Sequence, residues 1–102
     1  MKQVIDGLTY NTETAQEVGS WDNGLGRNDF NNCSETLYKT KNGRFFLAGE
    51  GGPMTRWSQP AGNMTSGGSG IQALTPEEAL IWCEQHGIDA DTIAEHFDVE
   101  DA

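Results

Sequence analysis

Two short apolar runs meet across a tight turn near the middle of the chain. Residues 37–40 and 45–48 are rich in aliphatic and aromatic side chains, and Asn42-Gly43 lies between them. Both central residues of a type I′ turn need positive φ, which Asn-Gly tolerates well. The pattern therefore predicts a β-hairpin with a type I′ turn, and it places this hairpin in the middle of a sheet.

The N-terminal residues predict a second hairpin and a short helix. Residues 2–10 form two short strand-like runs around Asp6-Gly7, another dipeptide typical of hairpin turns. Asn11 or the threonine after it can cap a short helix that continues to about residue 18, and Gly19 would end this helix.

Loops are predicted on both sides of the central hairpin. Residues 20–32 contain Trp21 and Phe30, which we expect to pin the loop onto the core; an exposed recognition surface is the alternative. Residues 54–58 are expected to be a short extended piece. Residues 59–70 are rich in Gly, Ser and Asn and predict a mobile loop. Residues 71–74 follow as a last strand.

The C-terminal third predicts two helices. Thr75, Pro76 and Glu78 provide an N-cap, a proline at the first helical position and the partner of a capping box, so a helix should run to about residue 86. Asp89 can cap a second helix that ends near residue 97. Apolar residues recur at i, i+3, i+4 and i+7 in both helices and predict their buried stripes. These residues are Ala79, Trp82, Cys83 and His86, then Ala90, Ile93, Ala94 and Phe97.

These elements predict one α+β domain over residues 1–102. We expect a small twisted antiparallel sheet of about five strands, packed by two C-terminal helices and one short N-terminal helix. Residues 98–102 should form a frayed acidic tail. A hydrophobic content of 35% and 13 glycines allow only one thin core.

Charge divides the chain into two unequal parts. The net charge is −10, yet residues 1–56 contain seven acids and all six bases, whereas residues 57–102 contain nine acids and no Lys or Arg. Such a surface repels nucleic acid and anionic membranes. It favours a basic protein partner.

The acidic residues of the helices follow a spacing of their own. Asp91, Glu95 and Asp98 recur at i, i+4 and i+7, away from the apolar stripe. Four helical residues rise roughly 6 Å, close to the separation of successive phosphates along a nucleic-acid strand. The sequence predicts a partner-binding acidic surface, and a merely solvated face is the alternative. Its residues are Glu77, Glu84, Asp91, Glu95, Asp98, Glu100 and Asp101.

Other candidate chemistry is better explained by structure. Cys83, His86, His96 and Cys33 could supply zinc ligands, but helical packing already accounts for the first two. A Cys83 nucleophile with His86 as its base is disfavoured for the same reason. The Gly-rich run 49–52 lacks the Lys-Ser/Thr of a phosphate loop, so we expect a turn or bulge with unusual backbone angles there. We therefore predict no catalytic residue, no metal and no cofactor.

The sequence predicts neither a signal peptide nor a membrane-spanning segment. The N-terminus lacks the apolar run of a signal peptide, and no stretch is long enough to span a membrane. Two cysteines do not make a disulfide framework. We expect a cytoplasmic protein with reduced thiols.

Four segments carry a recognisable signature. They are Met1-Lys2-x-x-Ile5-x-Gly7-x-x-Tyr10-Asn11-Thr12-Glu13-Thr14-Ala15, Asp29-Phe30, the run from Glu35 to Gly52 apart from Ala48, and Leu74-Thr75-x-Glu77-Glu78-Ala79-x-x-Trp82. In these segments the chain resembles a family of small acidic proteins carried by bacterial plasmids and phages. The likeness covers most of the chain and departs from it in the Gly/Ser loop and the extreme C-terminus. Some members are anti-CRISPR proteins that act on type I systems as mimics of double-stranded DNA.

The resemblance implies a function that fits the charge. We expect an inhibitor that places an acidic surface in the DNA channel of a type I CRISPR effector (Cascade) and blocks target DNA binding, without catalysis. One alternative is a non-catalytic accessory module of a mobile element that binds another host protein, through the loop 21–30 or the loop 59–70. Another is a small enzyme with Cys83 or Cys33 as its nucleophile.

Overall fold

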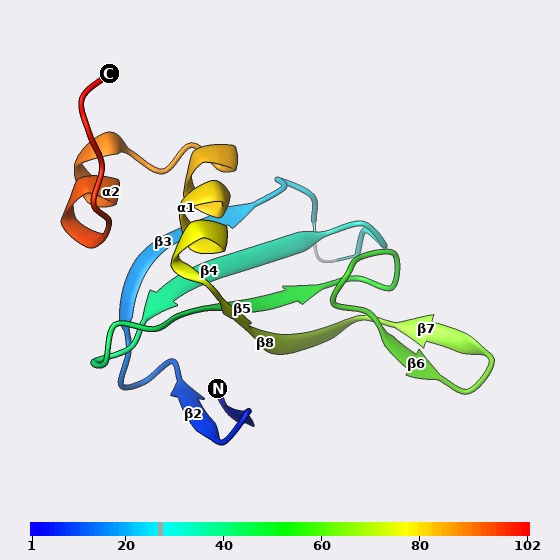
Figure 1. Ribbon diagram of the computed structural model, residues 1–102. Helices are drawn as coiled ribbons and strands as arrows, with labels where there is room; N and C mark the ends of the chain where they lie inside the picture. Colours follow the sequence, from blue (N-terminus) through cyan, green and yellow to red (C-terminus); the bar gives the residue numbers. More distant parts are fainter. Residues whose placement is uncertain (27) are drawn as a thin grey trace.

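A four-stranded antiparallel sheet is the centre of the fold (Figure 1). The computed structural model describes residues 1–26 and 28–102. Its elements are β1 (Lys2–Ile5), β2 (Leu8–Asn11), β3 (Gln16–Asp22), β4 (Cys33–Lys39), β5 (Phe45–Gly51), β6 (Gln59–Ala61), β7 (Met64–Ser66), β8 (Gly68–Leu74), α1 (Pro76–Gln85) and α2 (Ala90–His96). The strand order β3-β4-β5-β8 places the predicted β4–β5 hairpin in the middle, and β1-β2 and β6-β7 pair separately. The α+β class with a mostly antiparallel sheet and two C-terminal helices is confirmed.

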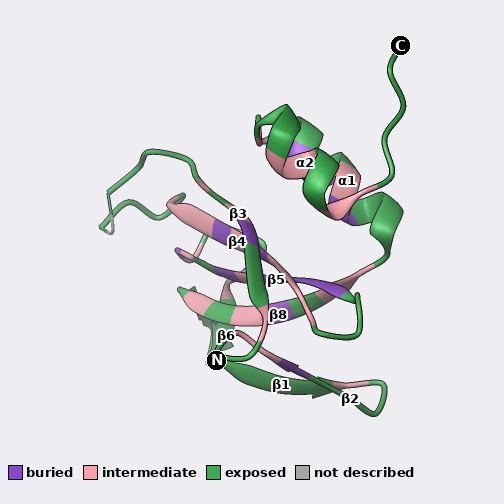
Figure 2. Cartoon of the chain, turned by 90° about the vertical axis from the view of Figure 1, so that its left-hand side faces the viewer, coloured by how far each residue is buried: buried purple, intermediate pink, exposed green. Residues whose placement is uncertain are grey.

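Each face of the central sheet has its own core. Leu37 pairs with Leu47 across β4 and β5, and both pack with Trp82 of α1. The next pair in register, Tyr38 and Phe46, points to the opposite face because side chains alternate along a strand. Figures 1 and 2 show the helices on one side of the sheet and the β1–β2 hairpin on the other.

The second core is small and aromatic. Tyr10 of β2 meets Phe46 edge-on, with ring centroids 5.4 Å apart, and Ile71 of β8 completes the buried group. The Tyr38 ring stacks on Phe46 at 5.2 Å. The N-terminal hairpin thus packs on the sheet face opposite the C-terminal helices, for which the sequence predicted no covering element.

The short N-terminal helix predicted through residue 18 is absent, and that prediction is wrong. Asn11 does use its side chain as a cap would, because its Oδ1 accepts the Glu13 N–H at 2.9 Å, but it closes a turn. The chain then enters β3, which pairs with β4 and shifts register between Glu17 and Gly19. Pairing with β4 and burial of Val18 outweigh the weak local preference for a helix.

The central hairpin is confirmed, but its predicted type I′ turn is wrong. Gly43 has φ +82°, whereas Asp6 is the only non-glycine among the described residues with positive φ, so Asn42 does not meet the type I′ requirement. The Gly43 N–H donates to Thr40 O at 2.9 Å, and the Thr40 N–H donates to Arg44 O at 2.8 Å. The first hairpin does fulfil the requirement, with positive φ at both Asp6 and Gly7.

The Gly/Ser segment also differs from prediction. Residues 59–66 form the β6–β7 hairpin, and the last strand begins at Gly68, so the described residues hold eight strands where about five were expected. Residues 54–58 are turns and not an extended piece. A two-stranded ribbon with all six side chains exposed leaves no apolar alternation for sequence reasoning to detect.

The two helices bury unequal amounts of surface. The capping box of α1 is present: the Glu78 N–H donates to Thr75 Oγ1 at 3.1 Å, and Thr75 N–H donates to Glu78 Oε1 at 2.9 Å. Its stripe is buried as predicted at Ala79, Trp82 and Cys83. In α2 no residue is fully buried, and its predicted apolar stripe is exposed at Ala90 and Ala94.

A buried carboxylate joins three parts of the fold. Glu35 on β4 is 4% exposed, and its two oxygens accept the Nε1–H groups of Trp57 at 2.8 Å and Trp82 at 2.9 Å. Arg56 Nη1 lies 3.6 Å from the same carboxylate, and it is half exposed. Burial of a charge is tolerated when it is paired and hydrogen-bonded, as here.

We expect Glu35→Gln to destabilise the fold by about 1–3 kcal/mol. A glutamine offers one acceptor oxygen, whereas both indoles only donate, so one buried N–H would lose its partner. Urea unfolding followed by circular dichroism measures the change. Glu50→Gln, at an exposed carboxylate on β5, is the control and should leave the midpoint unchanged. Equal midpoints for the two variants would contradict the role given to Glu35.

Gly49→Ala should also destabilise the fold, through sterics. A Cβ on Gly49 would lie 2.1 Å from Cε2 of Trp57, so the indole that reaches Glu35 would have to move. Overpacking of this kind typically costs about 1–3 kcal/mol. The same experiment on Gly26→Ala is the control, because nothing lies within 4 Å of a Cβ there. A urea midpoint equal to that of the control would show that the Trp57 ring moves without loss of stability and would contradict this prediction.

Candidate partner-binding surface

The seven predicted acidic residues are all exposed. Glu77 and Glu84 lie on α1, and Asp91 and Glu95 lie on α2. Among the described residues the only ion pair is the one between Arg56 and Glu35, so none of the seven has a cation within 4 Å. These carboxylates are therefore free to meet a cationic partner.

The helical spacing of the acidic residues holds only in part. The helix α2 ends at His96, and its C-cap, Phe97, has extended angles of φ −135° and ψ 151°. Asp98 thus does not continue the face of Asp91 and Glu95, and the predicted i, i+7 relation is wrong. The cause is the Phe97 ring, which leaves the helix to stack on Phe45 with centroids 4.8 Å apart.

The C-terminal tail adds charge without regular structure. Asp98, Glu100 and Asp101 lie beyond the last helix, in residues that have no assigned secondary structure and are exposed. Figure 1 shows this tail leading away from α2. The acidic surface thus consists of two short helices and an extended end, and it is less regular than one continuous helical face.

The N-terminus of α2 is fixed by Asp89, whose Oδ1 accepts the Thr92 N–H at 2.7 Å. Hydrogen bonding with the Thr92 side chain, followed by this backbone hydrogen bond, holds the pKa of the Asp89 carboxyl below its usual value of 3.8. The connection between the helices lies on β3, because a Cβ on Gly19 would meet Ile88 Cδ1 at 2.7 Å. Position 19 thus requires a small residue for α2 to reach its place.

Glu95 lies beside the basic turn of the central hairpin. Lys39, Lys41, Glu95 and His96 line one hollow of about 590 Å³ between α2 and the β4–β5 turn. Lys41 and Glu95 are more than fifty residues apart in the sequence. The fold brings them together, so the acidic surface borders a positive one.

The candidate metal and nucleophile residues lie in packed surroundings. Cys83 is fully buried, and burial, followed by the charge of Glu84, raises the pKa of its thiol. The His86 ring lies 4.3 Å from the Trp21 ring and 4.8 Å from the Trp82 ring. The residues that the structure describes contain no group of three or more metal-ligating side chains. A neutral buried thiol is a poor nucleophile.

The Gly-rich run at the end of β5 serves close packing. Gly49, Gly51 and Gly52 do not have positive φ, so the expected unusual backbone angles are wrong. A Cβ on Gly51 would lie 2.3 Å from Thr55 Oγ1, and one on Gly52 would lie 2.5 Å from Phe30 O. These glycines allow neighbouring segments to lie directly on the strand.

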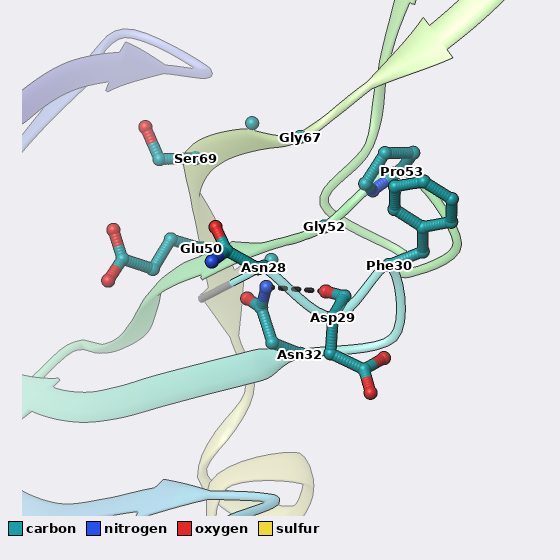
Figure 3. Close-up of a pocket in the computed structure, with 11 residues that line it drawn as sticks. Asn28, Asp29, Phe30, Asn32, Glu50, Gly52, Pro53, Gly67 and Ser69 are labelled. Atoms are coloured by element: carbon teal, nitrogen blue, oxygen red, sulfur yellow. Dashed lines mark hydrogen bonds between the residues drawn. The ribbon is translucent and has the colours of Figure 1, made fainter. Parts of the chain in front are cut away.

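A groove of about 590 Å³ lies above this run, and Figure 3 shows its lining. Phe30 is 66% exposed, and its ring lies beside Pro53 at the rim. The expectation that both aromatics pin the loop 20–32 is therefore right for Trp21, which packs against the core, and wrong for Phe30.

Within the described residues, no helix is long and apolar enough to cross a membrane.

We expect Asp89→Ala to loosen α2 in a pH-dependent manner. Because the folded pKa of Asp89 is lowered, its stabilisation is present above the unfolded value and is lost as pH falls below 3.8 through the folded value. The thermal midpoint of the variant should thus be lower than that of the parent near pH 7, and the two should converge in acid. Asp89→Asn keeps a capping oxygen and is the control. A difference that is constant with pH would contradict the role of the charge.

The exposed acids, the adjoining basic turn and the groove at Phe30 are the features that can meet a partner. No family model, no curated protein and no solved structure matches this chain.

Proposed function

We propose that this chain is an anti-CRISPR protein that inhibits a type I CRISPR effector by mimicking DNA. Its acidic surface would occupy the Lys/Arg-lined channel for target DNA and so prevent DNA from binding. The observation that carries the proposal is the group of exposed carboxylates without cation partners in the described residues of the C-terminal half. The family resemblance of the hairpin and helix-start motifs supports the choice of partner.

Electrostatics explains how such a surface works. A channel that grips phosphates holds cations at positions where an acidic protein can replace the polyanion. Complementary charge steers the encounter and raises the association rate, and salt screens this attraction. The mechanism needs occupancy alone, so no catalytic group, metal or cofactor takes part. The proposal places the protein in the cytoplasm of the bacterial host, where the effector acts.

The local structure supports a surface of defined shape. The capping box fixes the start of α1, where Glu77 lies, and Asp89 fixes the start of α2. Trp82 ties α1 to the sheet through Glu35. Carboxylates on anchored helices lose less conformational entropy on binding than carboxylates on free loops.

A second candidate is an accessory module that binds another host protein through the groove at Phe30. An aromatic side chain that is 66% exposed beside a groove is a common anchor of protein interfaces. Binding through this groove would depend little on salt and would be lost in Phe30→Ala. The proposed DNA mimicry predicts the opposite result in both experiments.

Reversal of Asp91, Glu95 and Asp98 to Lys should reduce inhibition by on the order of tenfold or more. Each lost attraction is replaced by repulsion, and 1.4 kcal/mol already corresponds to a factor of ten. The measurement is target-DNA binding by a purified type I effector with increasing inhibitor, at two salt concentrations.

The control reverses Glu13, Glu17 and Glu50 to Lys, which are exposed and lie outside the helices. Both triple variants change the net charge by the same amount, so a difference between them reports position and not total charge. If the helical variant inhibits as well as the parent, the mimicry proposal is wrong.

A further inference from the structure

The β4–β5 turn is the basic end of an acidic molecule. Lys39, Lys41 and Arg44 lie in or beside it, and they are three of the six bases in the chain. None of them has an acidic group within 4 Å among the described residues, where the one ion pair belongs to Arg56. The positive charge of these side chains is therefore uncompensated at short range.

The backbone of this turn offers two further donors. Thr40, Gly43 and Arg44 use their N–H groups to close the turn. The N–H groups of Lys41 and Asn42 donate to no described atom, and both residues are exposed. Exposed N–H groups in a turn can donate to an anion that approaches the backbone.

The turn separates two hollows. Lys39 and Lys41 line the one beside α2, together with Glu95 and His96. On the other side, Arg44 lines a hollow of about 500 Å³ that also contains Glu78, whose Oε1 already accepts the Thr75 N–H. Cations thus flank the turn on both sides, and a continuous polyanion laid across it could reach both.

We propose that the β4–β5 turn binds the phosphodiester backbone of a nucleic-acid strand. The inference rests on the proposed function in one respect: the strand would be one that the effector already holds beside its channel. The acidic helices would then face the protein and the basic turn would face the strand. A contact of both signs fixes the orientation of the inhibitor, which an acidic surface alone does not.

The direct test is a titration of the ¹⁵N-labelled protein with a short oligouridine at about 0.1 M salt. At this ionic strength the Debye length is about 10 Å, so distant carboxylates are screened while a phosphate on the turn remains close to its cations. We expect selective amide shifts at Lys41, Asn42 and Arg44. Absence of shifts at the turn would overturn the proposal, as would shifts caused by a polyglutamate peptide and not by the oligonucleotide.

Matched variants sharpen this test. Lys41→Glu should weaken oligouridine binding severalfold and lower the slope of log affinity against log salt by about one. Lys2→Glu has the same change in charge on exposed β1 and should have no effect. Glu95→Gln removes the acid that shares the hollow with the lysines, so it should strengthen oligouridine binding. Equal binding by the Lys41 and Lys2 variants would contradict the site.

The inhibition assay separates the two proposals. If the acidic surface acts alone, Lys41→Glu adds negative charge and should leave inhibition equal or stronger; if the turn also binds a strand, inhibition should weaken. If the amides of the turn do not shift while inhibition still depends on the acidic surface, only the proposal for the turn is wrong. If these amides do shift while the variant with Asp91, Glu95 and Asp98 reversed inhibits fully, only the proposal of DNA mimicry is wrong.

Discussion

The carboxylate of Glu35 is the constraint on which the rest of this small fold depends. A buried charge has to be satisfied, and here two indole N–H groups and one guanidinium approach it. Trp57 comes from the segment after β5, and Trp82 comes from α1, so one side chain on β4 holds both to the sheet. The absence of a side chain at Gly49 gives the Trp57 ring its place. With 35% hydrophobic residues, such a polar connection adds specificity that a thin apolar core does not provide.

Elements defined by local chemistry could be predicted from the sequence. The capping box at Thr75, the glycine turn at Gly43 and the alternation along β4 and β5 each act within a few residues. The strand at Gln16–Asp22 could not be predicted, because its stability comes from pairing with β4 and not from its own residues. The β6–β7 ribbon is fully exposed and therefore lacks the pattern on which prediction relies.

In the candidate site, too, local features could be predicted from the sequence and features that depend on tertiary contacts could not. Net charge identified the acidic half of the chain, since charge needs no knowledge of the fold. Its shape was beyond prediction, because α2 ends at His96, the Phe97 ring stacks on Phe45, and Asp98 lies outside the helix. The nearness of Glu95 to Lys41 depends on how a helix lies against a hairpin distant in sequence. The groove at Phe30 likewise arises where glycines allow a distant loop to lie on β5.

The sheet of this protein is occupied on both faces, by the helices on one side and the N-terminal hairpin on the other. Both faces are thus covered in part, and the exposed side chains that a partner can contact lie on the helices, the turns, the tail and the open parts of the strands. The helices and turns also supply the core side chains Trp57, Ala79, Trp82 and Cys83, so only their exposed side chains can be exchanged at little cost to folding. The architecture therefore keeps the side chains that stabilise the fold apart from the side chains that a partner can contact.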